Sequence, residues 1–378
     1  MKTYNLFYAC MALLVLIGCS KTESGDSGNN GGEKTVQANY TLIVNNQGNL
    51  SGTLFNVEDE ALTIKTEESK FTSMSTPDLS FDENSVLTTY TTKTNCSGTL
   101  TVHDFNDNSN VSFDVFSDLG ACNLTVKSIA RKGNKLYLAY ELHITSTLDE
   151  FYVRALDVSV AVPTFVDVEL EQRPIELAYA NNRLFVLGLD EALTDENSIT
   201  AIDASANSVI HTQLIGFDVR RIFTNPANNI IISYDNLHST LNSVTMALSY
   251  TSYGEGKEPN FTESSTLHFD SAGKMYYQMS PTAYSEFPVI PAIYDFSKNL
   301  TVLYAYENFM TETQLNFEFN IEKTTMVSYD EENDLLLIGY KKTSGANKGG
   351  LLLIKPAPDP ELLNSIDVVG IPTAIFVN

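Results

Sequence analysis

The chain of 378 residues has no tryptophan, only five histidines, and 23 lysine and arginine residues against 47 aspartate and glutamate residues. The resulting net charge of −24 excludes a general nucleic-acid-binding protein, because binding to phosphates requires a basic surface. No apolar run reaches the roughly 18 residues that a transmembrane helix needs. Hydrophobic residues nevertheless make up 43% of the chain, which is typical of a folded globular protein.

Sequence motifs of several enzyme classes are also missing. The chain has no Gly-x-Ser-x-Gly nucleophile elbow, no P-loop, no Gly-x-Gly-x-x-Gly fingerprint and no His-Glu-x-x-His zinc helix. The histidines never fall at the spacing of metal ligands, so we interpret them as strand or surface residues and predict no cofactor and no metal. A fold that gathers distant residues could still build an active site. The five histidines are His103, His143, His211, His238 and His268.

The N-terminus has the three parts of an export signal. Lys2 carries a positive charge, residues 6–17 form an apolar stretch, and Gly18 and Cys19 follow. The segment Leu16-Ile17-Gly18-Cys19 resembles a bacterial lipobox, which implies removal of the signal peptide, residues 1–18, and acylation of Cys19, with palmitate among the lipids. Acyl chains of this kind hold a protein at a membrane. A plain secretory peptide with an incidental cysteine is the alternative.

Residues 19–38 are predicted to form the lipidated cysteine and a flexible tether. The segment after Cys19 is rich in Ser, Gly, Asp and Asn, a composition that favours an unstructured linker. Together with the lipobox, it resembles the start of lipoproteins of the Bacteroidota type. Ser20 follows the cysteine, which favours sorting to the outer membrane, on its periplasmic face or at the cell surface.

The remaining cysteines predict one disulfide. Cys10 leaves with the signal and Cys19 takes the lipid, so that Cys96 and Cys122 remain in the exported body. An even pair of cysteines in an exported chain favours a disulfide bond. Two thiols that bind a metal are the alternative, but neither a second pair nor a histidine cluster lies nearby in the sequence.

From residue 39 onward the chain repeats a pattern of short strands separated by Gly, Asn, Asp and Pro. The strongest strand of each repeat, which we interpret as its second, follows a tight turn such as Asn181-Asn182. The spacings between successive second strands are 46, 49, 48, 46, 45 and 61 residues. A period in the forties with four strands per unit indicates a β-propeller. The second strands are predicted to begin near Tyr40, Val86, Lys135, Arg183, Asn229, Lys274 and Leu335.

The two ends of the repeat region complement each other. Residues 372–378 have the pattern of a first strand with nothing after it, and residues 40–57 have the pattern of second and third strands with nothing before them. Joining them completes one blade and removes two open sheet edges. We therefore predict an all-β fold for residues 39–378, a seven-bladed β-propeller of four-stranded antiparallel blades closed by the C-terminal strand. This arrangement resembles the YVTN/WD40-like propellers; six or eight blades are the alternatives.

The sixth repeat is the widest and supplies the first candidate site. Its extra length includes the proline-rich segment 279–291, which is expected on the face where the links between blades lie. Tyr284 and Phe287 in this segment, with Tyr253 in the preceding repeat, could form an aromatic platform for a sugar ring or a partner protein. The alternative is that these rings fill the space between blades.

Charged residues of the first strands supply the second candidate site. Aligned repeats place Glu176 with Arg221, and Lys127 with Arg220, at equivalent positions. Innermost strands line the axial channel of a propeller, so these four side chains are expected near its mouth. They could contact a ligand, or they could line a water-filled tunnel.

Together these patterns predict a lipid-anchored propeller of the cell envelope that acts as a non-catalytic binding module. Its ligand would be a glycan or another small molecule, or an envelope protein. The alternative is a propeller enzyme, lactonase- or lyase-like, with an axial active site. A third hypothesis is a structural lipoprotein that uses its outer rim, which an apolar patch there would favour.

Overall fold

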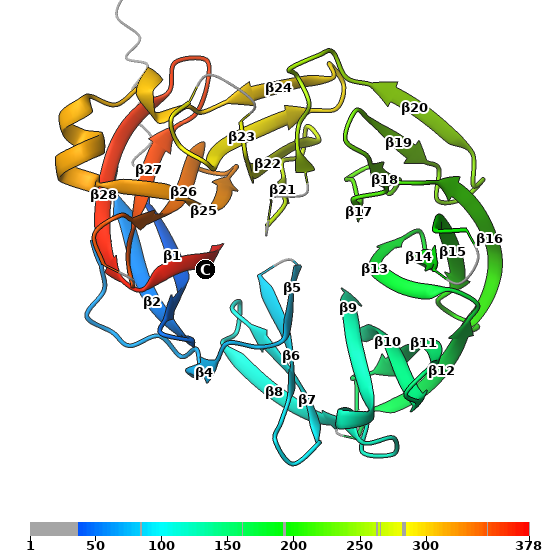
Figure 1. The fold of residues 1–378 in the computed structure, drawn as a ribbon. Helices are drawn as coiled ribbons and strands as arrows, with labels where there is room; N and C mark the ends of the chain where they lie inside the picture. Colours follow the sequence, from blue (N-terminus) through cyan, green and yellow to red (C-terminus); the bar gives the residue numbers. More distant parts are fainter. Residues whose placement is uncertain are drawn as a thin grey trace, which may run out of the picture. The chain divides into compact units, whose positions relative to one another are not determined.

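The computed structural model describes residues 37–83, 85–160, 162–191, 194–261, 264, 266–281, 285–345 and 347–377. These residues form seven antiparallel sheets around a central axis, so the prediction of an all-β, seven-bladed propeller is confirmed (Figure 1). The ring lies within the compact unit Val36–Asn378. Cys19 and the predicted tether lie outside the described residues. None of the helices in the described part of the chain has the length and hydrophobicity to cross a membrane.

The first strand of each sheet lies next to the axis (Figure 1). These strands are mixed in burial, since one edge faces the axis and both faces pack against neighbouring blades. The seven first strands in the described residues are β5 (Leu79–Glu83), β9 (Leu124–Lys132), β13 (Arg173–Ala180), β17 (Arg221–Thr224), β21 (His268–Phe269), β25 (Ile321–Asp330) and β29 (Ile371–Val377).

The second and third strands form the core of each blade. Both faces of these strands are covered by adjacent blades, so they have continuous hydrophobic runs where a half-exposed strand would alternate. The second strands begin within three residues of the predicted positions: β1 (Gln37–Asn46), β6 (Val86–Thr92), β10 (Lys135–Thr145), β14 (Arg183–Asp190), β18 (Ile230–Ser233), β22 (Lys274–Met279) and β26 (Leu335–Lys342). The third strands are β2 (Asn49–Glu58), β7 (Gly98–Asp104), β11 (Leu148–Asp157), β15 (Glu196–Asp203), β19 (Leu237–Leu241), β23 (Ile290–Asp295) and β27 (Lys348–Lys355).

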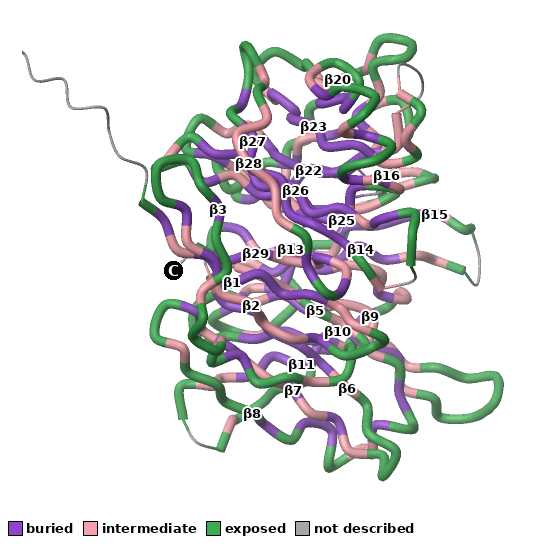
Figure 2. Tube along the Cα trace, turned by 90° about the vertical axis from the view of Figure 1, so that its left-hand side faces the viewer, coloured by how far each residue is buried: buried purple, intermediate pink, exposed green. Residues whose placement is uncertain are grey.

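The fourth strands and the loops form the exposed rim, whereas the buried residues lie in the middle of each blade (Figure 2). A short extra strand, β4 (Met74–Ser75), pairs with β2. The fourth strands are β3 (Ala61–Ile64), β8 (Ser109–Val115), β12 (Thr164–Leu170), β16 (Ser208–Gly216), β20 (Leu248–Ser252), β24 (Leu300–Leu303) and β28 (Glu361–Val369). Short helices follow β8, as η1 (Ala121–Asn123), and β24, as η3 (Tyr306–Asn308) and η4 (Gln314–Phe319).

Tight turns join the first and second strands on one face of the ring, which we call the turn face. In the fourth blade, Asn181 and Asn182 both have positive φ angles, of 49° and 59°. This is the backbone of a type I′ hairpin turn, which asparagine tolerates better than most residues. The opposite face, which we call the link face, carries the links between blades and the loops between second and third strands.

The ring closes as predicted, because the C-terminal strand β29 pairs with the N-terminal strand β1. Their antiparallel register places Tyr40 opposite Val377. The closing strand also contacts the second blade, where the rings of Phe376 and Phe105 stack with centroids 4.0 Å apart. Closure therefore joins the two ends of the described chain and pairs the sheet edge of each.

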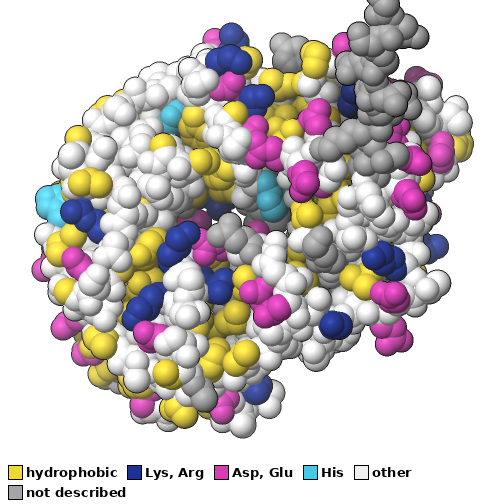
Figure 3. All heavy atoms as spheres, turned by 180° about the vertical axis from the view of Figure 1, so that it is seen from behind, with side chains coloured by type: hydrophobic (Ala, Val, Ile, Leu, Met, Phe, Trp, Pro, Cys, Tyr) yellow, Lys and Arg dark blue, Asp and Glu magenta, His cyan; other side chains and the backbone are white. Residues whose placement is uncertain are grey.

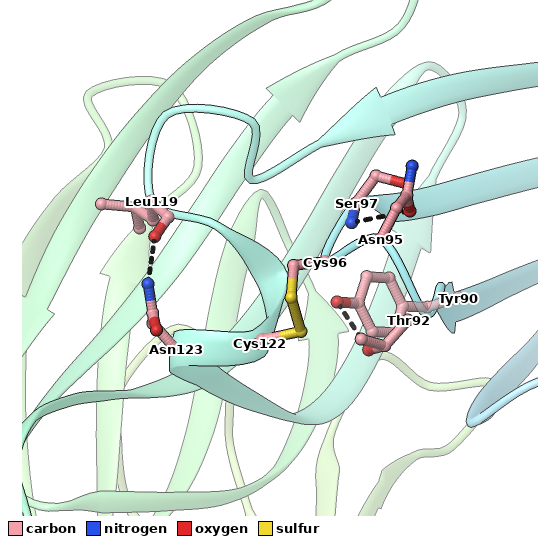
Figure 4. Close-up of a disulfide and its surroundings, with 8 residues drawn as sticks. All are labelled: Tyr90, Thr92, Asn95, Cys96, Ser97, Leu119, Cys122 and Asn123. Atoms are coloured by element: carbon pink, nitrogen blue, oxygen red, sulfur yellow. Dashed lines mark hydrogen bonds between the residues drawn. A yellow bond between two sulfur atoms is a disulfide. The ribbon is translucent and has the colours of Figure 1, made fainter.

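The predicted disulfide between Cys96 and Cys122 is present, with Cα atoms 4.9 Å apart (Figure 4). Cys96 lies in the loop between β6 and β7, and Cys122 lies in η1, on the link to the third blade. The backbone N–H of Ala121 also donates a hydrogen bond of 2.9 Å to the carbonyl of Cys96. The disulfide thus joins a loop of the second blade to the following link.

The extra length of the sixth repeat is divided between two segments of the link face. The loop 280–289, between β22 and β23, is longer than its counterpart 93–97 in the second blade. The larger part is the link 304–320, which contains η3 and η4. This link was not singled out from the sequence, because its apolar residues resemble those of a strand.

Candidate functional site

A cavity of about 1220 Å³ follows the axis of the ring. All seven first strands of the described residues contribute to its wall, from Leu79 on β5 to Val377 on β29. This axial channel is the place where the fold gathers side chains that are far apart in the sequence.

The charge of the axial channel differs from that of the whole chain. Its described lining contains five lysine and arginine residues against three carboxylates, although the chain as a whole carries a net charge of −24. Figure 3 shows lysine and arginine side chains beside the central hollow, with acidic side chains among them. The cations are Lys127, Arg131, Lys132, Arg220 and Arg221, and the carboxylates are Asp82, Glu83 and Glu176.

Glu176 and Arg221, both predicted site residues, meet in the channel from adjacent blades. Arg221 Nη2 lies 3.4 Å from Glu176 Oε1, and Glu176 Oε2 accepts a hydrogen bond of 2.6 Å from the backbone N–H of Ile222. Burial raises the pKa of the Glu176 carboxyl, while the charge of Arg221 and the hydrogen bond from Ile222 lower it in part. Arg221 also donates to the carbonyls of Phe261 and Ser264, at 3.1 and 2.9 Å. The pair therefore links the fourth and fifth blades to the segment between β20 and β21.

Lys127, another predicted site residue, belongs to a chain of ion pairs near the link face. Its Nζ lies 3.0 Å from Oε2 of Glu141, a carboxylate that is almost fully buried. Arg173 lies 3.7 Å from the other oxygen of Glu141 and 2.5 Å from Glu191. The charge of Lys127 is therefore already compensated within the protein.

Arg220, the fourth predicted channel residue, is also paired. Its guanidinium donates to both oxygens of Asp235, at 2.8 and 2.6 Å, and both side chains are exposed. The structure therefore brings all four predicted charges to the channel lining and gives each of them a protein partner. Their role as ligand contacts stays a prediction.

Three other side chains of the channel lack such partners. Arg131, Asp82 and His268 form no hydrogen bond or ion pair within 4.0 Å with any described residue. The Nε atom of Arg131 is moreover buried without an acceptor. Buried polar groups are normally paired within the protein or with water, so these three are the groups that a ligand in the channel could satisfy.

Arg131 and Asp82 occupy equivalent positions in neighbouring blades. Arg131 pairs with Leu136, and Asp82 pairs with Leu87. Each is the second residue pair counted from the turn between the first and second strands. In four of the other blades the same position holds an aromatic residue. His268 lies one residue earlier on β21, opposite Tyr276. The four aromatic residues are Tyr179, Phe223, Phe269 and Tyr329.

Arg131, Asp82 and His268 are not among the site residues predicted from the sequence. A detectable signal existed, because aligning the repeats on their hairpin turns reveals two charged residues in an otherwise aromatic layer. The layer lies toward the turn-face end of the channel, whereas the prediction placed ligand binding at the link face. Whether a charged side chain has a protein partner could not be read from the sequence.

The residues of the predicted aromatic platform pack separately. The hydroxyl of Tyr253 lies 2.9 Å from Nδ1 of His238, and its ring lies 6.4 Å from that of Tyr294. Phe287 packs edge-on against Tyr306, with ring centroids 5.1 Å apart. Both rings are half-buried against the core of the sixth blade. Tyr284 lies outside the described residues, so a platform made by the three aromatics stays a prediction.

Two further observations concern metal binding and a hydrogen-bonded group of side chains of the types found in catalytic sites. Among the described residues, no three His, Cys, Asp or Glu side chains are grouped so that they could hold a metal ion. A hydrogen-bonded chain of Thr125, His143 and Asp149 lies on the exposed surface of the third blade, with distances of 2.9 and 2.8 Å. It lies outside the channel lining, and we interpret it as a cross-strand contact.

Comparisons with protein-family models and with curated proteins give no match. Among solved structures, a putative 6-phosphogluconolactonase from Bacteroides fragilis has a TM-score of 0.54 and 11% sequence identity. The match covers 96% of this chain and 100% of that one. A hypothetical selenium-binding protein from Sulfolobus tokodaii has a TM-score of 0.49 and 9% identity over 91% of this chain and 94% of its own.

A puromycin-hydrolysing peptidase from Mycobacterium tuberculosis matches 86% of this chain, with a TM-score of 0.47 and 9% identity. The present chain spans about half of the length of that peptidase, 53%. At these identities the similarity concerns the fold alone. By these comparisons the chain is similar to β-propeller proteins.

Proposed function

We propose that this protein is a non-catalytic binding module of the cell envelope and that its ligand is a small organic anion held in the axial channel. The observation that carries the proposal is Arg131, a cation in an aromatic layer of the channel wall without a protein partner. An anionic group would satisfy this guanidinium with charge-assisted hydrogen bonds. The other four cations of the lining are paired with carboxylates of the protein, so Arg131 is the channel cation that an anion could reach without competition from an ion pair.

The location in the envelope rests on the predicted lipidation of Cys19. The described chain begins at Gln37, where β1 starts on the turn face. The predicted tether would therefore be attached to the ring at the start of β1. Replacing Cys19 with serine should abolish metabolic labelling with a palmitate analogue and release the protein from the membrane fraction.

The binding test uses the full chain and three probes: sulfate, glucuronate and glucose. Sulfate and glucuronate should raise the melting temperature and bind in calorimetry, whereas neutral glucose should not. Arg131→Gln should weaken anion binding by at least about tenfold, because a charge-assisted contact is lost. The ligand-free variant should be as stable as the wild type, since the guanidinium has no protein partner to lose.

The matched control is Lys298→Gln, which removes one positive charge from an exposed side chain that pairs with the buried Asp295 outside the channel lining. This variant should bind the anions like the wild type. Equal weakening by both substitutions would indicate an effect of net charge and would contradict the proposal, as would unchanged binding in Arg131→Gln.

A lactonase- or lyase-like enzyme is the second candidate, and His268 with Asp82 is the observation that favours it. An imidazole on β21 and a carboxylate on β5, both in the channel lining and neither hydrogen-bonded to a described residue, are the side-chain types of general acid–base catalysis. The structure most similar in fold among those above is described as a putative 6-phosphogluconolactonase. Hydrolysis of gluconolactone that His268→Gln abolishes would support the enzyme and contradict the non-catalytic module.

A further inference from the structure

His268 is an ionisable group inside the axial channel. It lies on the short first strand β21 of the sixth blade, and its side chain is half-buried in the channel wall. No described residue forms a hydrogen bond with its imidazole. Because nothing in the protein fixes its protonation state through a direct contact, the contents of the channel can change that state.

The charged and titratable groups around His268 come from four other elements. Asp82 on β5 interacts electrostatically with the imidazole. Tyr276 on β22 is the cross-strand partner of His268, and its hydroxyl donates to Asp270 at 3.2 Å. Tyr329 on β25 stacks on Tyr276 with ring centroids 4.2 Å apart.

Arg221 on β17 also lines the channel and is paired with Glu176. Burial raises the pKa of both tyrosines, so they remain neutral across the physiological range. Asp82 is therefore the one acidic group of this set that lines the channel without a hydrogen bond or ion pair within 4.0 Å to a described residue.

These surroundings set the state of His268 in the empty channel. Burial lowers the pKa of the imidazole from its ordinary value of 6.5, and the charge of Asp82 opposes this effect only in part. His268 is thus neutral at pH 7. An anion in the channel adds negative charge next to a desolvated imidazole and favours its protonated form.

We infer that the channel binds its anion together with one proton, and that His268 takes up this proton. The inference rests on the proposed function, since it requires anion binding in the channel. The ligand class it selects is an acid that is fully ionised near neutral pH, so that the proton taken up goes to His268 and not to the ligand. Affinity should increase as the pH falls, because protonation of His268 then costs less free energy.

Sulfate is the probe for this test, because its charge is constant between about pH 5 and pH 8. Calorimetric titration of the full chain in two buffers of different ionisation enthalpy gives the number of protons taken up per sulfate bound. We expect net proton uptake at pH 7, at most about half a proton per sulfate for one unit of pKa shift, and an affinity up to about tenfold higher at pH 5.5 than at pH 8.

The variant His268→Gln should still bind sulfate at pH 8, through Arg131, but with no proton uptake and little dependence on pH. His211→Gln is the control, because His211 is exposed on the outer strand β16 and should leave both properties unchanged. Binding without proton uptake in the wild type would overturn the inference and leave the proposed function standing. Proton uptake that persists in His268→Gln would also overturn it, and absence of sulfate binding at every pH would overturn both.

Discussion

The hydroxyl of Tyr40 donates a hydrogen bond of 2.6 Å to Oδ2 of Asp330, across 290 positions of the sequence. Tyr40 lies on β1, in the blade that the chain's two ends build together, and Asp330 ends the first strand of the seventh blade. Both side chains are buried. Asp330 also accepts a hydrogen bond of 2.8 Å from the side chain of Asn333. This hydrogen bond therefore joins the first blade, in which β29 pairs with β1, to the seventh blade next to it.

Replacing Tyr40 with phenylalanine should lower the free energy of unfolding by about 1.5–3 kcal/mol, because a buried carboxylate loses a donor. Urea denaturation measures this effect. Tyr329→Phe is the control, since its hydroxyl donates to Asp334 at an exposed site and its loss should cost little. Equal losses of unfolding free energy in the two variants would contradict the prediction, because burial of the Tyr40–Asp330 hydrogen bond would then add no stability.

The disulfide should stabilise the second blade and the link that follows it. Cys96 and Cys122 are 26 residues apart, a loop whose closure is worth about 3.5 kcal/mol in the chain-entropy model. Replacing both cysteines with alanine should lower the melting temperature measured by circular dichroism. Reductant should destabilise the wild type toward the same value and leave the double variant unchanged; a wild type that is indifferent to reductant would contradict this assignment.

Arg154 should be the most costly arginine to remove from the third blade. Its side chain is 1% exposed, donates to both oxygens of Asp118 and of Asp167, and lies 4.0 Å from the ring centroid of Phe165. Arg154→Met leaves two carboxylates without their common cation, so we expect a loss of about 3–5 kcal/mol. Arg220→Gln, which breaks the exposed pair with Asp235, should cost about 0–1 kcal/mol.

The same cluster should contribute to acid sensitivity. The hydrogen bonds from Arg154 hold the pKa of Asp118 below its ordinary value. A carboxyl with a lowered pKa in the folded state stabilises the protein above its unfolded pKa, and this contribution is lost as the pH falls through the folded value. Asp118→Asn should therefore destabilise the protein at pH 7, and this deficit should shrink as the pH falls below the ordinary pKa of an aspartate, measured by urea unfolding at each pH. An equal deficit at every pH would contradict the assignment.

Glu176 should show the opposite dependence on pH. Burial raises its pKa in the folded state, so its contribution to stability is present below the unfolded pKa and is lost as the pH rises through the folded pKa. Arg221→Gln removes the opposing charge, and the variant should be more destabilised at pH 8 than at pH 5. Combining it with Glu176→Gln should remove this difference, and its persistence would assign the effect to another group.

The fold could be predicted from the sequence because the same pattern of turns and strands recurs in every blade. Each blade needs a tight turn before a second strand that is buried on both faces, so hydrophobic runs recur with a period in the forties. The closure could be predicted as well, since residues 372–378 and 40–57 each lack the strands that the other supplies. The link 304–320 could not be predicted, because it departs from the repeat.

The site was predicted less well than the fold. The sequence places Glu176, Arg221, Arg220 and Lys127 on the channel lining. It does not reveal that carboxylates pair with all three cations, because two of these carboxylates, Glu141 and Asp235, come from other parts of the chain. Arg131 shows the converse. Only the structure reveals that this charged side chain has no partner, because pairing depends on side chains from several blades.

The location of a bound anion tests the central claim most directly. Selenate resembles sulfate and gives an anomalous X-ray signal, so a crystal of the full chain grown with selenate would reveal where it binds. The account predicts a peak inside the axial channel within hydrogen-bonding distance, about 3 Å, of the guanidinium of Arg131. Peaks confined to the outer surface, with an empty channel at saturating selenate, would contradict it.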